Sequence, residues 1–279
     1  DVAGPTTKAE CLNTVWQALL RDEAGEQCVV KAVLLHDAED VVHPLELRLV
    51  GQWLEHCAAI QLPVVPLRFP GSRFVSGHYL DEFAEAHGRV LLVRQALGAG
   101  LPLAGVGCAI RRDVLARIAA ARGGSPFDST SLTEDYELGL TIKAMGGRVR
   151  LARVAERPGG RPVAVRAYFP AHLPAAVRQK ARWMTGIALA GWDRTGWSRW
   201  GAVADHWMRM RDRRATLAMP VLAIAYATLV VWGGALVGHL ALGTPSPTLP
   251  EETNALLWTN MALLGWRAAV RAAFVGRTY

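Results

Sequence analysis

Three acidic residues follow an apolar run near the start of the chain. The run CVVKAVLLH, residues 28–36, leads directly into Asp37, Glu39 and Asp40. Ligands of open α/β sheets bind beyond the carboxyl ends of the strands, and closely spaced carboxylates suit Mg²⁺ or Mn²⁺. Alternatively, Asp40 or His43 caps the next helix and the other carboxylates lie in solvent. Both interpretations stay open on this cluster alone.

A second acidic group lies in SLTEDYELGL, where Thr133, Glu134 and Asp135 open an expected helix. A carboxylate at this position can act as a general base that accepts a proton from a substrate hydroxyl. A structural role is equally compatible with the pattern. Ser131 or Thr133 can serve as the N-cap, and the helix dipole favours acidic residues in the first turn.

A third group is Gln179, Arg182 and Trp183 in RQKARW, at spacings that can share one helix face. Arginine can bind a phosphate through two parallel hydrogen bonds, and tryptophan can form a platform for a sugar ring. The alternative is a helix at a membrane interface, anchored by its Arg and Trp side chains.

Strand-like runs alternate with helical patterns, which predicts an α/β fold with a mostly parallel sheet. The expected strands are residues 28–36, 62–69, 105–110, 148–154 and 163–169, and the expected helices are residues 6–21, 44–57, 78–97, 132–145 and 173–191. The first strand is a continuous apolar run, so we expect it to be covered on both faces.

The chain changes character after Pro170. Residues 192–214 are rich in Trp and Arg, typical of a helix lying at a membrane surface. Residues 215–242 contain no Asp, Glu, Lys or Arg, and a bilayer core needs only about 20 apolar residues. Arginines precede this run and none follows it in the loop 243–254, so the positive-inside rule places the preceding residues in the cytoplasm.

A second apolar helix, residues 255–276, carries Arg267 and Arg271. It either returns across the membrane, with its arginines snorkelling or paired with protein, or lies at the interface. The pattern does not choose between the two.

The composition excludes some classes of function. The net charge of the 279 residues is +7, carried almost wholly by arginine. Nucleic-acid binding is disfavoured, because the Trp- and Arg-rich stretch directly adjoins an uncharged run that membrane anchoring explains better. The four cysteines form no C-x-x-C pair, which argues against a zinc site.

Taken together, the motifs resemble the membrane-bound family 2 glycosyltransferases, the processive group that includes cellulose and hyaluronan synthases. The family's D-x-D, T/E-E-D and Q-x-x-R-W motifs are matched in order by D-A-E at 37–39, T-E-D at 133–135 and Q-K-A-R-W at 179–183. GPTTKAECLN and PLAGVGCAIRRDVL also resemble family segments. Within this family, the phage-adsorption type of bacterial inner-membrane glycosyltransferase is the most similar, through the segments HDAEDVVHP, RQKARW and GWDRTGW. The resemblance covers most of residues 4–242.

The resemblance implies a GT-A fold and inverting transfer of a sugar from a nucleotide-sugar donor, a UDP-sugar, to a glycan acceptor. It implies a catalytic base at Asp135, and a divalent cation, Mg²⁺ or Mn²⁺, held by Asp37 and Glu39. The implied substrate-binding residues are Asp37, Glu134, Gln179, Arg182, Trp183 and Lys8. Trp183 would contact the acceptor sugar, while Gln179 and Arg182 would contact the diphosphate.

The expected division is a partial GT-A domain over residues 1–170, the Q-x-x-R-W helix and an interfacial segment over 171–214, and a transmembrane region over 215–279. The expected setting is the bacterial inner membrane with a cytoplasmic catalytic domain. Expected partners are membrane lipid and an envelope export partner, in addition to the donor and acceptor, for a role in exopolysaccharide or surface-glycan synthesis.

Two departures from the family pattern qualify these expectations. The middle motif is D-A-E rather than D-A-D, which puts a longer side chain at Glu39. The family's first strands, with their uracil-binding Asp, would precede residue 1, so we interpret the domain as N-terminally truncated. We therefore expect that the fragment alone can be inactive. The alternative function is a non-catalytic membrane scaffold or surface-assembly component that retains the fold.

Overall fold

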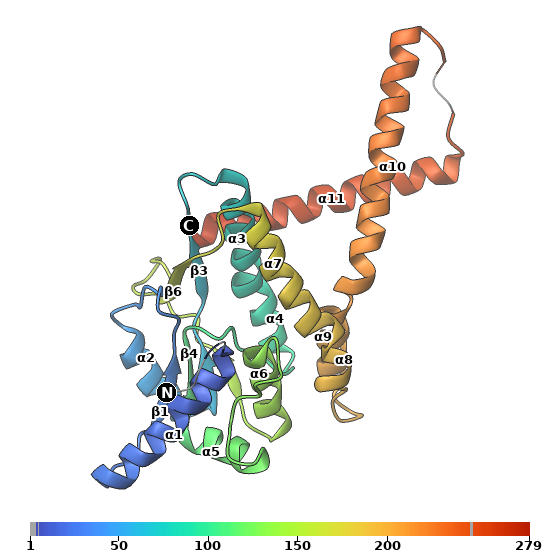
Figure 1. Cartoon of the computed structure of the whole chain (residues 1–279). Coiled ribbons are helices and arrows are strands. Elements are labelled where there is room, and N and C mark those ends of the chain that lie inside the picture. Colours follow the sequence, from blue (N-terminus) through green and yellow to red (C-terminus); the bar gives the residue numbers. More distant parts are fainter. Residues whose placement is uncertain (1–3, 5, 246–247) are drawn as a thin grey trace.

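The computed structural model describes residue 4, residues 6–245 and residues 248–279. A mixed α/β domain forms most of the chain, and two long helices extend away from it (Figure 1). Two expectations touch residues outside this description. These are position 5 of the GPTTKAECLN segment and positions 246–247 of the loop after the apolar run.

The described strands form two small sheets. The strands are β1 (Ala32–Leu35), β2 (Ala59–Gln61), β3 (Val64–Leu67), β4 (Cys108–Arg111), β5 (Val149–Leu151) and β6 (Val165–Tyr168). Four of them form a sheet in the order β1-β4-β2-β5, and β3 pairs with β6. The expected strand over 62–69 is therefore shorter, and β2 just before it was not predicted.

The α/β class is confirmed, but the expectation of a mostly parallel sheet needs correction. β4 pairs antiparallel with both β1 and β2, whereas β2–β5 and β3–β6 are parallel. Gln61, the last residue of β2, lies opposite Cys108, the first residue of β4. The chain thus enters β4 at the end where β2 leaves, and apolar runs do not encode this direction.

The expectation that the first strand is covered on both faces is also wrong. β1 lies at the edge of the four-stranded sheet, and Ala32, Val33 and Leu34 are only partly buried. Leu35 is the buried residue of this strand, and it directly precedes the acidic segment.

The helices surround the sheets (Figure 1). In chain order they are α1 (Lys8–Glu26), α2 (Glu46–Trp53), α3 (Arg73–Glu85), the π-helix η1 (Ala86–Val90), α4 (Leu91–Ala96), α5 (Arg112–Ala121), α6 (Glu134–Ala144), α7 (Leu173–Trp183), the π-helix η2 (Met184–Leu189), α8 (Gly191–Arg194), α9 (Val203–Arg213), α10 (Ala215–Leu242) and α11 (Glu251–Thr278). The expected helices over 78–97 and 173–191 both contain a π-helical segment, which periodicity did not reveal.

Particular residues set where α1 begins and how closely α6 packs on the rest of the domain; both helices carry candidate site residues. α1 begins with a capping box, in which the Thr7 side chain and the Glu10 side chain bond each other's backbone N–H groups. α6 can lie directly against the loop before β4 because Gly139 has no side chain at the contact. A Cβ at this position would collide with the carbonyl oxygen of Leu101. This close approach places the start of α6 near the sheet edge.

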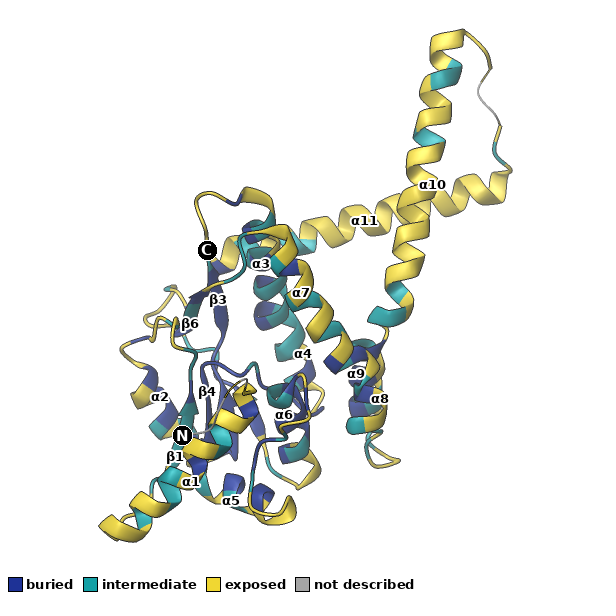
Figure 2. Ribbon diagram, viewed as in Figure 1, coloured by how far each residue is buried: buried dark blue, intermediate teal, exposed yellow. Residues whose placement is uncertain are grey.

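The core lies between the sheet and the helices on its faces (Figure 2). Its main cluster includes fully buried Ile110 of β4, Leu115 and Ile118 of α5, and Leu138 and Ile142 of α6. Burial of large aliphatic side chains is worth roughly 1.5–3 kcal/mol each relative to exposure. The core therefore holds α6, and with it the T-E-D segment, firmly on the sheet.

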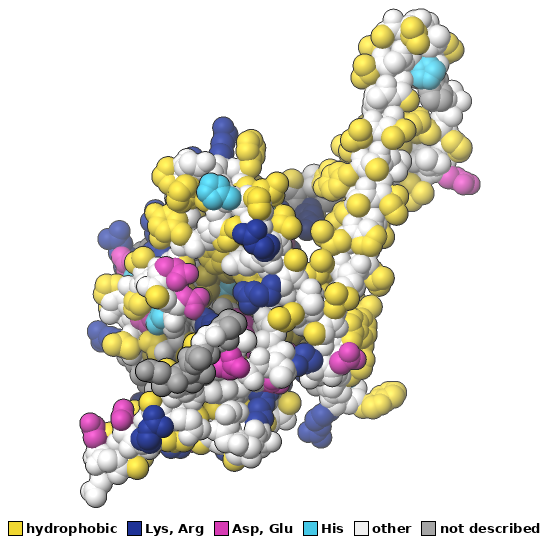
Figure 3. Space-filling view, viewed as in Figure 1, with side chains coloured by type: hydrophobic (Ala, Val, Ile, Leu, Met, Phe, Trp, Pro, Cys, Tyr) yellow, Lys and Arg dark blue, Asp and Glu magenta, His cyan; other side chains and the backbone are white. Residues whose placement is uncertain are grey.

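The predicted apolar span is confirmed as a single helix, α10, over the expected residues. It is the one helix of the described residues that is long and apolar enough to cross a membrane, by length and composition. None of its residues is buried by protein, and apolar side chains cover the face seen in Figure 3. Such an exposed apolar surface needs another apolar environment.

The end of α11 packs against α3 of the α/β domain (Figure 1). Arg271 Nε lies 3.4 Å from Glu85 Oε2, and the Tyr279 hydroxyl donates to the Pro66 carbonyl at 3.1 Å. Of the alternatives for the arginines of this helix, the structure therefore shows Arg271 paired with protein.

Candidate active site

The first acidic residue of the D-A-E segment meets a lysine from the start of the chain. Lys8, in the first turn of α1, forms an ion pair with Asp37 just beyond β1, and its ammonium group donates to the Gly105 carbonyl at 3.2 Å. Burial by itself lowers the pKa of Lys8, but the Asp37, Asp135 and Glu134 carboxylates outweigh it and the pKa is raised. Lys8 is therefore a permanent cation between the two acidic motifs.

Asp40, the acidic residue that follows the D-A-E segment, has a structural role. The Asp40 side chain accepts from the Asp37 backbone N–H at 2.9 Å, and its Oδ2 lies 3.1 Å from His36 Nδ1. The other ring nitrogen of His36 lies 2.8 Å from Glu46 Oε1, in a carboxylate that is fully buried in α2. Asp40 thus closes the turn after β1, but it does not cap α2 as the capping interpretation expected, because the N-cap position of α2 is Leu45 and has no side-chain capping hydrogen bond. The His36 bridge fixes this turn to α2.

Glu39 is exposed at the tip of the same turn. In the described part of the chain, no three His, Cys, Asp or Glu side chains converge into a preformed metal site. Mg²⁺ is commonly held by one or two carboxylates, with substrate phosphates and water completing its shell. The carboxylates of Asp37 and Glu39 fit a cation that arrives with a diphosphate; they do not form a cage that holds one alone.

The T-E-D segment forms the first turn of α6. Thr133 is the N-cap position, but its side chain makes no capping hydrogen bond. The Asp135 carboxylate accepts from the Tyr136 backbone N–H at 2.8 Å. It also lies directly over Gly105, where a Cβ would come within 2.7 Å of Asp135 Oδ2 and where φ is +73°. Gly105 therefore allows the carboxylate to reach the Lys8 side of the site.

The environment of Asp135 changes its acidity. Burial, and then the neighbouring Glu134 carboxylate, raise the pKa of Asp135 to about 6, against the opposing effects of the Tyr136 N–H, Lys8 and Arg182. The side chain is a carboxylate at neutral pH, yet it binds a proton far better than an ordinary aspartate. This is the property that a general base needs.

The Q-x-x-R-W residues of α7 contact two different parts of the structure. Gln179 Oε1 accepts from the buried Tyr79 hydroxyl of α3 at 2.8 Å, and the Trp183 ring lies edge-on to the Tyr79 ring at 6.4 Å. The guanidinium of Arg182 instead donates to the Leu132 carbonyl at 3.0 Å, just before α6. The structure thus brings Arg182 to the Asp135 end of the site and holds Gln179 and Trp183 against α3.

The helix α7 continues into η2, which packs tightly on the T-E-D segment. A Cβ at Gly186 would lie 2.6 Å from Thr133 Oγ1. Farther along, Arg194 of α8 bonds Asp128 at 2.6 Å and also pairs with Glu137 of α6. These contacts fix the position of the Q-x-x-R-W helix relative to Asp135.

Two residues that position the site, His36 and Tyr79, were not predicted from the sequence. His36 lies beside the D-A-E segment, but its bridge to α2 depends on a buried Glu46 ten residues away. Tyr79 contacts Gln179 across 100 residues of sequence. The only local signal for either was the histidine in HDAED.

The sequence of the chain matches a known protein family. The model of the family described as glycosyl transferase family group 2 matches residues 32–270, which is most of the chain and spans all three motifs. The chain belongs to this glycosyltransferase family. This confirms the family that the motifs indicated.

Two curated relatives are similar along almost the whole chain. They are bacteriophage adsorption protein B of Escherichia coli strain K12 and bacteriophage N4 adsorption protein B of Escherichia coli O157:H7. Each is 35% identical over 303 aligned residues, covering 99% of this chain and 40% of the relative. The phage-adsorption type expected from the motifs is thereby confirmed, and the glycosyltransferase chain spans less than half the length of these relatives.

Proposed function

We propose that this chain carries the transfer site of a membrane glycosyltransferase, which moves a sugar from a nucleotide-sugar donor to a hydroxyl of a glycan acceptor with inversion. A UDP-sugar is the donor we propose. The observation that carries the proposal is Asp135. It is a carboxylate of raised pKa at the start of α6, adjacent to a cationic Lys8 that also pairs with Asp37.

In this proposal Asp135 takes the proton from the attacking acceptor hydroxyl. Arg182 and Gln179 stabilise negative charge on the leaving diphosphate. The Arg182 guanidinium lies near this position because it bonds the Leu132 carbonyl, 3.0 Å away, just before α6. Trp183 supports the acceptor sugar beside α7. Glu134 and Lys8 set the charge around Asp135 and Asp37 and help to bind substrate.

Asp37 and Glu39 would hold the divalent cation, Mg²⁺ or Mn²⁺. When bound, the cation supplies positive charge that neutralises the diphosphate. We favour Glu39 over Asp40 as the second ligand, because the Asp40 side chain already bonds His36 and the Asp37 N–H.

We place the site at the cytoplasmic face of the bacterial inner membrane, with α10 as the anchor. The support is the apolar, uncharged α10 and the arginines that precede it. Synthesis of an exopolysaccharide or another surface glycan fits a transfer site beside a membrane span, with an envelope export partner receiving the product.

The experiment is a donor panel. Full-length protein in membranes, supplied with Mg²⁺ or Mn²⁺, should release UDP from one UDP-sugar and lose that release when Asp135→Asn is introduced. UDP release at the wild-type rate in the variant would refute the assignment of the base.

A second candidate function is favoured by the names of the two relatives, which refer to phage adsorption. In this alternative the chain is a non-catalytic scaffold or surface-assembly component, and the Lys8–Asp37 ion pair only stabilises the fold. Calorimetry of the full-length protein distinguishes the two, because the scaffold predicts no metal-dependent UDP binding.

A further inference from the structure

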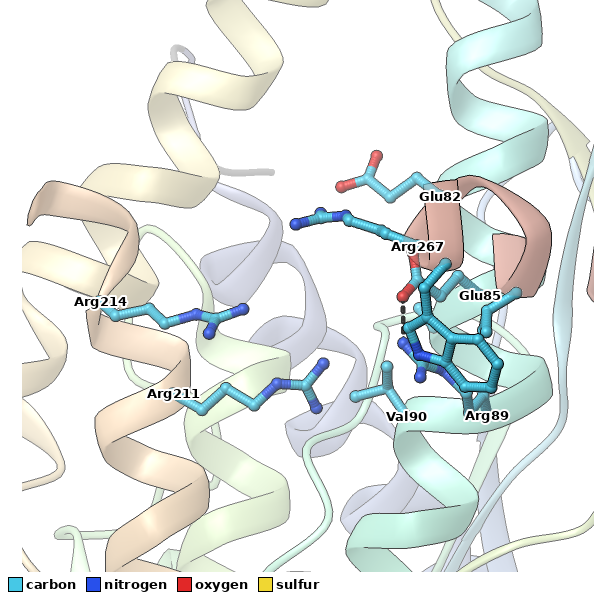
Figure 4. Close-up of a pocket in the computed structure, with 10 residues that line it drawn as sticks. Glu82, Glu85, Arg89, Val90, Arg211, Arg214 and Arg267 are labelled. Carbon is cyan, nitrogen blue, oxygen red and sulfur yellow. Dashed lines mark hydrogen bonds and ion pairs between the residues drawn. The ribbon is translucent and has the colours of Figure 1, made fainter. Parts of the chain in front are cut away.

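A polar hollow lies apart from the candidate active site, where three parts of the chain meet at the foot of α10 (Figure 4). Its volume is about 370 Å³. The polar and aromatic residues that line it are Glu82 and Glu85 of α3, Arg89 of η1, Arg211 of α9, Arg214 at the start of α10, and Trp266 and Arg267 of α11.

Positive charge exceeds negative charge in this hollow. Four guanidinium groups enter it, from Arg89, Arg211, Arg214 and Arg267. Both carboxylates are already engaged: Glu82 pairs with Lys180, and Glu85 pairs with Arg89 and with Arg271. The two lining carboxylates therefore neutralise the four arginines only in part, and the hollow keeps an excess of positive charge.

Arginines on two sides of the hollow lack an acidic partner. Figure 4 shows Arg211 and Arg214 reaching from the α9 side toward the opposite side of the hollow, where Val90, Arg89 and Arg267 lie. Among the ion pairs of the described residues, none includes Arg211, Arg214 or Arg267. The Arg89 Nε atom is buried and has no hydrogen-bond partner in the described chain.

The crowding of like charges also affects Arg211. Burial, followed by repulsion from Arg214 and Arg89, lowers the pKa of Arg211 in spite of Asp212 and Glu85. An anion placed among these groups would remove the repulsion. Planar guanidinium groups bind phosphate oxygens through paired hydrogen bonds, so a phosphate is the anion that this geometry suits.

The position of the hollow indicates where that phosphate comes from. Arg214 directly precedes the apolar helix α10, and Trp266 lies on the apolar helix α11. A membrane that surrounds α10 places its headgroups at this level, where Trp and Arg side chains concentrate. Basic pockets beside membrane helices on the cytoplasmic side bind the headgroups of anionic lipids.

We propose that this arginine hollow binds the phosphate of an anionic membrane lipid and thereby seats the α/β domain on the bilayer. Arg211, Arg214 and Arg267 are the ligands of the phosphate, and Trp266 contacts the glycerol region. The inference does not depend on the transfer reaction, because none of the hollow's lining residues belongs to the candidate active site.

Native mass spectrometry of the full chain in detergent tests this proposal, with phosphatidylglycerol, phosphatidylcholine and inorganic phosphate as the probes. We expect phosphatidylglycerol to bind the wild-type chain about tenfold more tightly than phosphatidylcholine, because both lipids carry the phosphate but the cationic choline group of phosphatidylcholine is repelled by the arginines. Inorganic phosphate should not displace it at equal concentration. Equal retention of the two lipids, or full displacement by inorganic phosphate, would overturn the lipid assignment.

Matched variants distinguish lipid binding in the hollow from a general effect of surface charge. Arg211→Gln combined with Arg214→Gln should lose the preference for phosphatidylglycerol. Arg21→Gln combined with Arg117→Gln removes the same charge at exposed positions of the α/β domain outside the hollow and should keep the preference. Equal losses in both double variants would contradict a specific site. If the first double variant does not fold, Arg267→Gln on the exposed part of α11 provides the same test.

Discussion

Lys8 of α1 forms an ion pair with Asp37 beyond β1, across 29 residues of sequence, and the same ammonium group bonds the Gly105 carbonyl beneath Asp135. One lysine thus links the D-A-E and T-E-D motifs. The first prediction follows from this link.

Replacing the lysine by an apolar side chain should impair donor binding. In Lys8→Met, Asp37 and Asp135 lose the cation between them, and we expect the KM for the donor to rise about tenfold, as loss of one charge-assisted hydrogen bond predicts. The folded state should lose no more than about 1 kcal/mol, because the pair is partly exposed. Lys31→Met is the control, since it removes an exposed pair with Glu55 that lies outside the site. UDP-release kinetics of the full-length protein provide the measurement, and equal effects of the two variants would contradict the assignment.

A methyl group at Gly105 should displace the Asp135 carboxylate. The Cβ of Gly105→Ala would come within 2.7 Å of Asp135 Oδ2, so turnover should fall by about 10- to 100-fold, the cost of misplacing a reacting group by about 1 Å. Gly123→Ala is the matched control, because Gly123 has φ +74° but open space around it. It separates backbone strain from displacement of Asp135, and similar losses of kcat in both variants would show that strain alone is responsible.

The raised pKa of Asp135 predicts the acid limb of the pH profile. The base acts as a carboxylate, so turnover should fall as the pH decreases through about 6, with a tenfold loss for each further pH unit. Glu134 raises this pKa, whereas Lys8 and Arg182 lower it. Glu134→Gln should therefore move the acid limb to lower pH. Profiles of kcat against pH for the two proteins check this, and an unchanged limb would contradict the assignment of the titrating group.

The same carboxylate has a linked effect on stability. Because folding raises its pKa, the charged Asp135 disfavours the folded state above pH 6, and the penalty shrinks between pH 6 and the unfolded value near 3.8. Asp135→Asn should therefore raise the free energy of unfolding by about 1 kcal/mol at pH 7.5, after allowance for solvent screening, and by less at pH 5. Thermal unfolding in detergent at both pH values measures the difference. A variant less stable than wild type at pH 7.5 would contradict this account of the site.

Support of Gln179 by Tyr79 can be tested by removing one oxygen atom. Tyr79→Phe loses the 2.8 Å hydrogen bond to Gln179 Oε1 but keeps the aromatic packing with Trp183 and Phe169. We expect the donor KM to rise roughly fivefold, in line with a neutral hydrogen bond worth about 1 kcal/mol, at nearly constant kcat. Tyr168→Phe is the control at an exposed tyrosine. A fall in kcat without a change in KM would place Tyr79 in another role.

The sequence predicted the parts of the fold that depend on local pattern. The bounds of α10 were found because a long uncharged run has few alternatives, and α6 was found because Gly146, where φ is +81°, closely follows its last residue, Ala144. The direction of β4 was not predictable from its own residues. It is set by where the chain enters the sheet after α4, and pairing partners far apart in sequence decide it.

The site shows the same division between local and distant information. Motif order was enough to single out Asp37, Asp135 and Arg182, whose chemistry is carried by residue type. The Tyr79 contact with Gln179 and the burial of Glu46 behind His36 depend on packing across helices, and no spacing rule contains them. Sequence reasoning thus singled out the candidate reacting groups more readily than the residues that position them.

The central claim is that Asp135 is the base of a sugar transfer, and one assay tests it most directly. Full-length protein in membranes is supplied with Mg²⁺ and a panel of UDP-sugars, and UDP release is measured for wild type and for Asp135→Asn. The account predicts release from one donor by the wild type and a loss of about 100-fold or more in the variant, the usual contribution of a general base. Release of UDP at the same rate by both proteins would contradict it.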